Sequence, residues 1–275
     1  MNPADFLVDN PVLNREFRGR MRVRKLTGKA WRVVAVIVAL IVCRYYYILL
    51  RAVQQGRPDD AVELWRDTSY LVLTLIALLS PALAATAISQ ELEQQTWDLL
   101  KVTRLTAWQV VIGKWLARQT IPALVLLIAL PLLLVSALHG DIGIAGFAAN
   151  FGYLALTSAF FSSMGLWCSA AARKTAAATA VSLLLMGVVC LGTCLIDGII
   201  SLLYQFRENQ GLGTHAMWVN PFYALSMMDD FIRDPNVYYP KLHLAVAETS
   251  VSFELAMVIL FLYLLAQRYQ ATAAS

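Results

Sequence analysis

Six long apolar runs are the feature that most limits what this chain can fold into. They cover roughly residues 33–50, 69–88, 111–138, 144–172, 176–203 and 245–266. Each run is long enough to cross the hydrocarbon core of a bilayer, about 30 Å thick, as a helix. Hydrophobic residues make up 59% of the chain and charged residues 15%, unlike the composition of a soluble domain. The sequence therefore predicts an all-α integral membrane protein with six transmembrane helices in a single domain over residues 1–275.

Lysine and arginine are unevenly distributed between the segments that connect these runs. With the N-terminus inside, the inner segments hold 15 of them, including Lys114 and Arg118 at the inner end of the third run, and the outer segments hold 6; Arg44, within the first run, is left out. An excess of basic residues marks the cytoplasmic side, so we expect both termini in the cytoplasm. The first apolar run is too long for the core of a signal peptide, which predicts a retained first span.

Two segments outside the spans have their own helical pattern. In the basic cytoplasmic segment 1–32, Leu13, Phe17 and Met21 recur every four residues among many arginines. This pattern predicts an amphipathic helix over residues 9–29 that lies in the membrane interface. The extracytoplasmic loop at 204–244 is rich in aromatic residues, so we expect short helices at the outer leaflet there.

The loop at 89–109, between the second and third spans, predicts a short capped helix on the cytoplasmic side. Acidic residues precede it, a threonine is placed to cap it, and two leucines give it an apolar face. A helix of this kind fits a groove on a soluble partner. The residues that form this pattern are Glu91, Glu93, Thr96, Trp97, Leu99 and Leu100.

This loop resembles the corresponding segment in the permease subunits of type-2 ABC transporters, an exporter-like bacterial group with six spans per subunit. The family pattern is roughly E-x-E-x-G-T-x-x-L-L, followed by P-L-S, a tryptophan and a terminal G-K. Two positions depart from it, because Gln95 stands where glycine is usual and Arg104 where proline is usual. The residues that match in register are Glu91, Glu93, Thr96, Leu99, Leu100, Leu105, Trp108, Gly113 and Lys114.

The resemblance implies a homo- or heterodimer of permease subunits in the bacterial plasma membrane, in contact with lipid. It also implies a separate cytosolic ATPase, docked on the loop, that would bind ATP and Mg²⁺. The sequence contains no G-x-x-x-x-G-K-[ST] phosphate-binding loop, so we expect no ATPase activity and no cofactor in this chain. No nucleic-acid partner is expected.

Three ionisable residues, Arg44, Asp197 and Glu254, lie within or near the ends of spans. A charge at the centre of a bilayer costs at least about 2.5 kcal/mol, which makes such residues candidates for an intramembrane polar site. Glu254 is the deepest. It could line a substrate or dimer cavity, form a structural pair with Arg44 or Asp197, or be exposed. The three histidines fall in separate outer segments, so no metal site is expected.

Other classes of function stay open on the sequence alone. A membrane-embedded enzyme would need paired catalytic groups, and the sequence has neither H-E-x-x-H nor G-x-S-x-G. A secondary transporter would typically show inverted repeats, which the sequence lacks. A non-transporting sensor or assembly platform with the same fold is a further alternative.

Overall fold

The computed structural model describes residues 58–95, 106–172, 174–204, 216–233 and 240–274, with the single residues 43, 46, 47 and 50. Throughout this part of the chain the regular structure is helical. Five helical stretches are long and apolar enough to cross a membrane, which confirms five of the six predicted spans. They are Ala61–Glu93, Ala107–His139, Ile144–Ala171, Thr175–Ile200 and Lys241–Ala271. The first predicted span and the amphipathic helix over residues 9–29 lie outside the described residues.

The first of these stretches is two helices, α4 (Pro58–Ala84) and α5 (Thr86–Glu93), separated by a turn at Ala85. Pro81 lies inside α4 one turn before the break. Proline has no N–H to donate and its ring crowds the preceding turn, so a helix bends at such a position. The neighbouring helix approaches the backbone closely here: a Cβ atom on Gly165 would lie 2.5 Å from the Pro81 carbonyl oxygen. Glycine is therefore required at this crossing.

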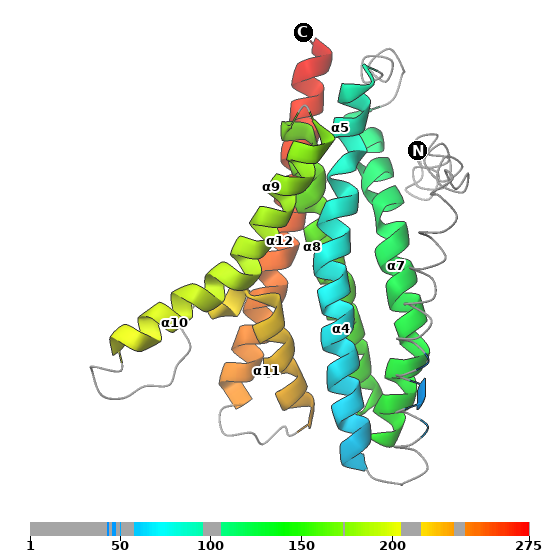
Figure 1. Cartoon of the computed structure of the whole chain (residues 1–275), viewed down its shortest axis with the longest axis vertical. Helices are drawn as coiled ribbons and strands as arrows, with labels where there is room; N and C mark the ends of the chain where they lie inside the picture. Colours follow the sequence, from blue (N-terminus) through cyan, green and yellow to red (C-terminus); the bar gives the residue numbers. More distant parts are fainter. Residues whose placement is uncertain are drawn as a thin grey trace.

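Helices α7 (Ala107–His139) and α8 (Ile144–Ala171) follow as two long antiparallel spans. Both pack against α4, as Figure 1 shows. A tight turn joins them, in which Asp141 has a φ of 54°. Aspartate is one of the few residues that tolerate this left-handed conformation.

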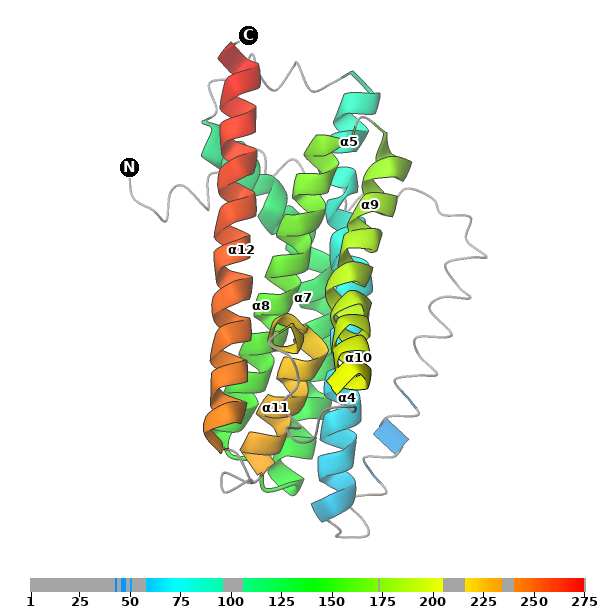
Figure 2. The same cartoon turned by 90° about the vertical axis from the view of Figure 1, so that its left-hand side faces the viewer.

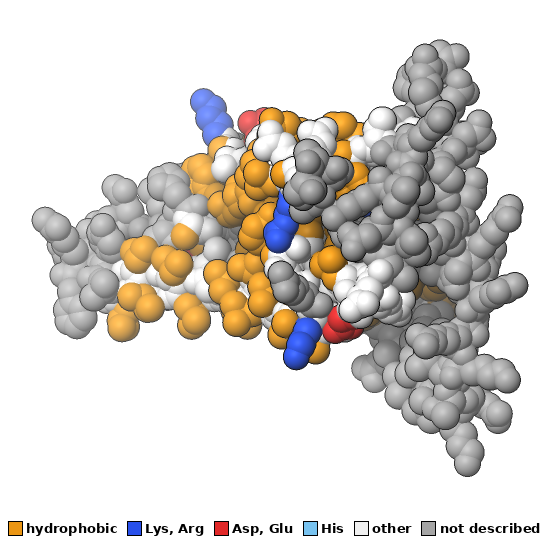
Figure 3. Space-filling model, turned by 90° about the horizontal axis from the view of Figure 1, so that it is seen from above, with side chains coloured by type: hydrophobic (Ala, Val, Ile, Leu, Met, Phe, Trp, Pro, Cys, Tyr) orange, Lys and Arg blue, Asp and Glu red, His pale blue; other side chains and the backbone are white. Residues whose placement is uncertain are grey.

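The next span leaves the bundle. It consists of α9 (Thr175–Gly187), a π-helical turn η1 (Val188–Gly192) and α10 (Thr193–Tyr204); together they are called the arm below. Figure 1 shows α10 pointing away from the other helices. Only 6% of the most apolar part of this span is buried, against 28% to 56% in the other four. Seen from above, hydrophobic side chains line the arm (Figure 3).

The chain returns through a short 3-10 turn, η2 (Met217–Val219), and helix α11 (Pro221–Arg233). Both lie in the predicted outer loop at 204–244, and α11 packs against the last helix, α12 (Pro240–Ala274) (Figure 2). Asp229 ties α11 to α4, because its carboxylate accepts hydrogen bonds from Trp65 Nε1 at 3.2 Å and Arg66 Nε at 2.7 Å. Arg66 also reaches Asp230, at 2.7 Å.

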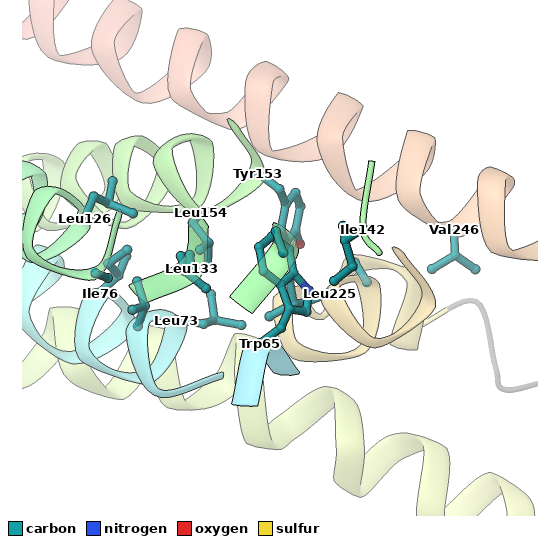
Figure 4. Packing of buried hydrophobic residues seen from close by; sticks show 14 residues of the cluster. Trp65, Leu73, Ile76, Leu126, Leu133, Ile142, Tyr153, Leu154, Leu225 and Val246 are labelled. Atoms are coloured by element: carbon teal, nitrogen blue, oxygen red, sulfur yellow. The ribbon is translucent and has the colours of Figure 1, made fainter. Parts of the chain in front are cut away.

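The main hydrophobic core lies where α4, α7, α8, α11 and α12 meet, and Figure 4 shows it from close by. Trp65 is at its centre and is fully buried. Its labelled members in Figure 4 are Trp65, Leu73, Ile76, Leu126, Leu133, Ile142, Tyr153, Leu154, Leu225 and Val246.

The elements alternate between the two ends of the bundle, and this alternation fixes where the candidate loop lies. The end of α5, the start of α9 and the end of α12 lie at one end (Figures 1 and 2). The turn between α7 and α8 lies at the opposite end. The end of α5 and the start of α7, which border the loop, therefore share their end of the molecule with the end of α12.

Candidate functional site

A buried ion pair closes the base of the loop between α5 and α7. Lys114 Nζ, on the second turn of α7, lies 2.7 Å from Glu91 Oε1 near the end of α5. It also donates to the Ala87 carbonyl oxygen at 3.3 Å. The Lys114 side chain is 1% exposed and that of Glu91 14%. Removal of either partner would leave a charge in an apolar setting, which typically costs 3–5 kcal/mol. This pair therefore fixes α5 to α7 on either side of the loop.

The first turn of α5 is held by side chains from other helices. Backbone N–H groups at the start of a helix have no partner within the helix. Here the Ser169 hydroxyl, from α8, accepts hydrogen bonds from Ile88 N at 2.8 Å and Ser89 N at 2.9 Å. Arg118 Nη1, from α7, donates to the Thr86 hydroxyl at 3.3 Å. The break after Pro81 is thus compensated by α7 and α8.

Glu93, the last residue of α5, binds the start of α9. Its Oε1 accepts a hydrogen bond from Thr175 N and its Oε2 accepts one from the Thr175 hydroxyl, both at 2.9 Å. Thr175 is the first residue of α9, and the preceding Lys174 makes no side-chain capping bond. A carboxylate at this position satisfies a free N–H group and interacts favourably with the helix dipole. Glu93 therefore links the loop to the arm.

The two borders of the loop differ in how they are formed. At the start of α7, Thr106 and Gln109 form a reciprocal capping box, with bonds of 3.3 and 2.9 Å between each side chain and the other residue's backbone. The T-x-x-Q spacing is a readable signal, and our sequence analysis missed it. After α5, Gln95 has a φ of 56°. This is the position where the family pattern has glycine, the residue best suited to a positive φ.

The predicted loop helix lies outside the described residues. Thr96, Trp97, Leu99 and Leu100 belong to that segment, so the cap and the apolar face stay predictions. Of the residues predicted to couple to an ATPase, the structure describes Glu91 and Glu93, and it gives them different partners. Their contacts with Lys114 and Thr175 could not be read from the sequence, because they join segments far apart in the chain.

A second polar cluster lies within the bundle around Glu254 on α12. The Glu254 side chain is buried, with the residue 1% exposed, so the alternative in which it is exposed does not hold. The Thr157 hydroxyl, on α8, lies 3.1 and 3.0 Å from its two carboxylate oxygens. Tyr153 donates to it at 3.3 Å and is itself 2.9 Å from the Ser250 hydroxyl. The cluster therefore joins α8 to α12.

Of the three predicted intramembrane ionisable residues, the structure describes Asp197 and Glu254, and it places them on different helices, α10 and α12. Asp197 is half-buried on α10, in the arm. Burial raises the pKa of the Tyr223 phenol on α11, and the nearby Asp197 carboxylate adds to that shift. Arg44 lies outside the described residues, so its predicted pairing with Glu254 stays a prediction. Within the described ranges, no three His, Cys, Asp or Glu side chains are placed to hold a metal ion.

These features define a multi-pass α-helical membrane protein whose loop between two spans is fixed to three different helices. The comparison with known families agrees with this class. The family described as ABC-2 type transporter matches residues 12–197, and the chain belongs to that family. It is a permease, the membrane component of an ABC transporter, and as such a transport component rather than an enzyme in itself. No curated protein matches the chain.

Proposed function

We propose that this chain is the transmembrane subunit of an ABC exporter, in which two subunits form the translocation pathway. A separate cytosolic ATPase binds ATP and Mg²⁺ and docks on the loop at 89–109. The protein lies in a bacterial plasma membrane with both termini in the cytoplasm. Membership of the ABC-2 family supports this proposal, because such permeases normally work with a cytosolic ATPase.

The observation that best supports docking on this loop is the way in which its base is fixed. A loop that receives force from a partner must transmit it rather than bend. Glu91 holds the base to α7, Glu93 holds it to α9, and Ser169 holds it to α8. Contacts to three spans allow a displacement of the loop base to reach the rest of the bundle. We therefore assign ATPase coupling to the loop, with Glu91 and Glu93 at its base and Thr96, Trp97, Leu99 and Leu100 in its helix.

The arm supports the proposed dimer. Its outward face presents large side chains to the surroundings, with Leu184 65%, Leu191 67% and Leu195 66% exposed. Together with Val188, which is 55% exposed, they recur at spacings of four, three and four residues, which places them on one side of the helix. This surface is suited to a second copy of the chain within the bilayer. The exporter direction rests on the resemblance to exporter-like permeases.

Replacement of Leu99 and Leu100 together by Ser tests the docking. A few apolar anchors dominate small interfaces, and each contributes about 1–2 kcal/mol. We therefore expect the double variant to lose the cognate ATPase in co-purification from membranes, at unchanged abundance of the permease. Gln94 and Gln95, in the same loop, are replaced by Ser as the matched control, since this removes no apolar surface. Undiminished co-purification of the leucine variant would show that the ATPase docks elsewhere.

A further inference from the structure

The contact between Glu93 and Thr175 joins the base of the loop to the inner end of the arm. Glu93 is the last residue of α5, and the loop begins directly after it. Thr175 is the first residue of α9, at the inner end of the arm. The two residues are 82 positions apart, and both carboxylate oxygens of Glu93 are engaged at 2.9 Å. A displacement of the loop therefore acts directly on the first turn of the arm.

The arm is less tightly packed on the bundle than the other spans are. It is the least buried of the five described spans, and the π-helical turn η1 interrupts its hydrogen-bond pattern at mid-length. Such turns frequently occur at functional sites. Asn220, which caps α11, donates from Nδ2 to the Cys190 carbonyl oxygen in η1 at 2.7 Å. The middle of the arm is thus held from the outer side, while Glu93 holds its inner end.

We propose that Glu93 is a positioning residue that transmits movement of the loop to the arm. This inference rests on the proposed function, because the movement is imposed by the docked ATPase. Glu91 has a different part: its partner Lys114 is buried, and this pair keeps the loop base on α7. The two acids of the family pattern therefore have different roles: Glu91 fixes the loop base to α7, and Glu93 transmits the movement of the loop to the arm.

Because Glu93 is exposed, its role in transmitting movement can be tested without disturbing the folding of the protein. The Glu93 side chain is exposed, and a carboxylate at an exposed helix N-terminus changes an equilibrium constant by only about two- to fivefold. A ligand shifts a conformational equilibrium by no more than the difference between its interactions with the two states. We therefore expect removal of the contact to leave folding intact and to weaken the coupling by about two- to fivefold.

Cys190 offers a reporter for the position of the arm. The residue is 7% exposed and belongs to one buried cluster with Phe160 and Phe161 of α8 and Val258 of α12. Movement of the arm away from these helices would expose it. The experiment uses the permease in complex with its cognate ATPase, with Cys43, Cys168 and Cys194 replaced by Ser. The rate at which N-ethylmaleimide labels Cys190 is measured without nucleotide and with a non-hydrolysable ATP analogue, and the ratio of the two rates is the result.

Two variants break the contact from opposite sides. Glu93→Ala removes the acceptor. Thr175→Pro removes both donors, and proline is well tolerated at the first position of a helix. The extended backbone of Lys174, with φ −118° and ψ 136°, is compatible with a following proline. Glu248→Ala is the matched control, because Glu248 is an exposed glutamate near the opposite end of α12.

We expect ATP to accelerate labelling in the wild-type complex, and both variants to lower the ratio about two- to fivefold while the control leaves it unchanged. A general loss of stability would raise both rates and leave the ratio as it was, and that result would overturn the inference. If the wild-type complex gave the same labelling rate with and without the ATP analogue, the inference would also be overturned. The proposed function would still stand in that case, provided that the permease and the ATPase remained bound to each other. If the wild-type permease does not co-purify with the ATPase, the proposed function itself fails, and this inference falls with it.

Discussion

Lys114 illustrates how single buried charges are held in this bundle. Its ammonium group lies among apolar side chains and meets a carboxylate and a backbone carbonyl. Glu254 and Asp229 are likewise buried, and each accepts hydrogen bonds from another helix. A buried charge without such partners would cost several kcal/mol. At the scale of the residue, these contacts therefore specify which helices are neighbours more than they add to the net free energy of folding.

Gln95 is the residue with the clearest local strain, because its φ of 56° lies in the left-handed region. For a residue with a Cβ atom this conformation costs roughly 1–2 kcal/mol, and glycine avoids most of this cost. Gln95→Gly is therefore expected to stabilise the protein by about 1 kcal/mol and to raise the midpoint of thermal unfolding in detergent.

Gln90 provides the matched control for this substitution. It is also an exposed glutamine, but it lies inside α5. Gln90→Gly should destabilise the protein by about 1 kcal/mol, because glycine is a poor helix former. Equal effects of the two substitutions on the unfolding midpoint would contradict the strain assigned to Gln95.

At the scale of elements, helix ends and helix breaks are stabilised by side chains from neighbouring helices. Ser169 caps α5 after the break at Ala85, Glu93 caps α9, and Asn220 binds the π-helical turn in the arm. Ser169 and Glu93 satisfy N–H groups that a helix start leaves free, and Asn220 adds a side-chain donor at a carbonyl inside the π-helical turn. The irregular positions in the spans are thus points at which separate helices are joined.

Helix α11 allows a test of this view, because two neighbouring aspartates bind the same arginine. Asp229 and Asp230 each lie 2.7 Å from Arg66, but the Asp229 side chain is 3% exposed and that of Asp230 is 35% exposed. Asp229→Ala should destabilise the protein by about 3 kcal/mol, because Arg66 and Trp65 lose a buried partner. Asp230→Ala should cost less than about 1 kcal/mol, as expected for a solvated pair.

The measurement is the thermal unfolding of both variants in the same detergent, with proteolysis of the α11 region followed in parallel. Earlier cleavage is expected for the Asp229 variant, whose α11 has lost its main contact with α4. If the two variants were equally stable, burial would not decide the strength of these ion pairs, and α11 would be held mainly by its apolar contacts.

The long helices could be predicted because an apolar run is a local pattern, and their ends could be predicted less well. The sequence places the start of the second span near residue 69, whereas the helix begins at Pro58. Its first turns include Trp65 and Arg66, whose polar atoms are satisfied by Asp229, far along the chain. A hydropathy pattern depends only on residues that are close in the sequence, so it does not predict such a contact. For the same reason the sequence indicated the acids of the loop but not their partners, Lys114 and Thr175.

At the scale of the whole molecule, the bundle separates two ends with different features. The loop base, the start of α9 and the end of α12 lie together at one end, and the turn between α7 and α8 lies at the other (Figure 1). The excess of 15 basic residues over 6 predicts that the first of these ends faces the cytoplasm. The ATPase would then meet the loop from the side on which ATP is available.

Single cysteines introduced into a cysteine-free variant test this orientation in intact cells. Asp141→Cys lies in the exposed turn between α7 and α8, and Gln95→Cys lies directly after α5. A membrane-impermeant maleimide should label the cysteine at position 141 in intact cells, and the cysteine at position 95 only after the membrane is opened. Gln210→Cys, in the predicted outer loop at 204–244, should behave like Asp141→Cys. The reverse pattern would place the loop outside, where no cytosolic ATPase could reach it, and would overturn both the topology and the proposed docking.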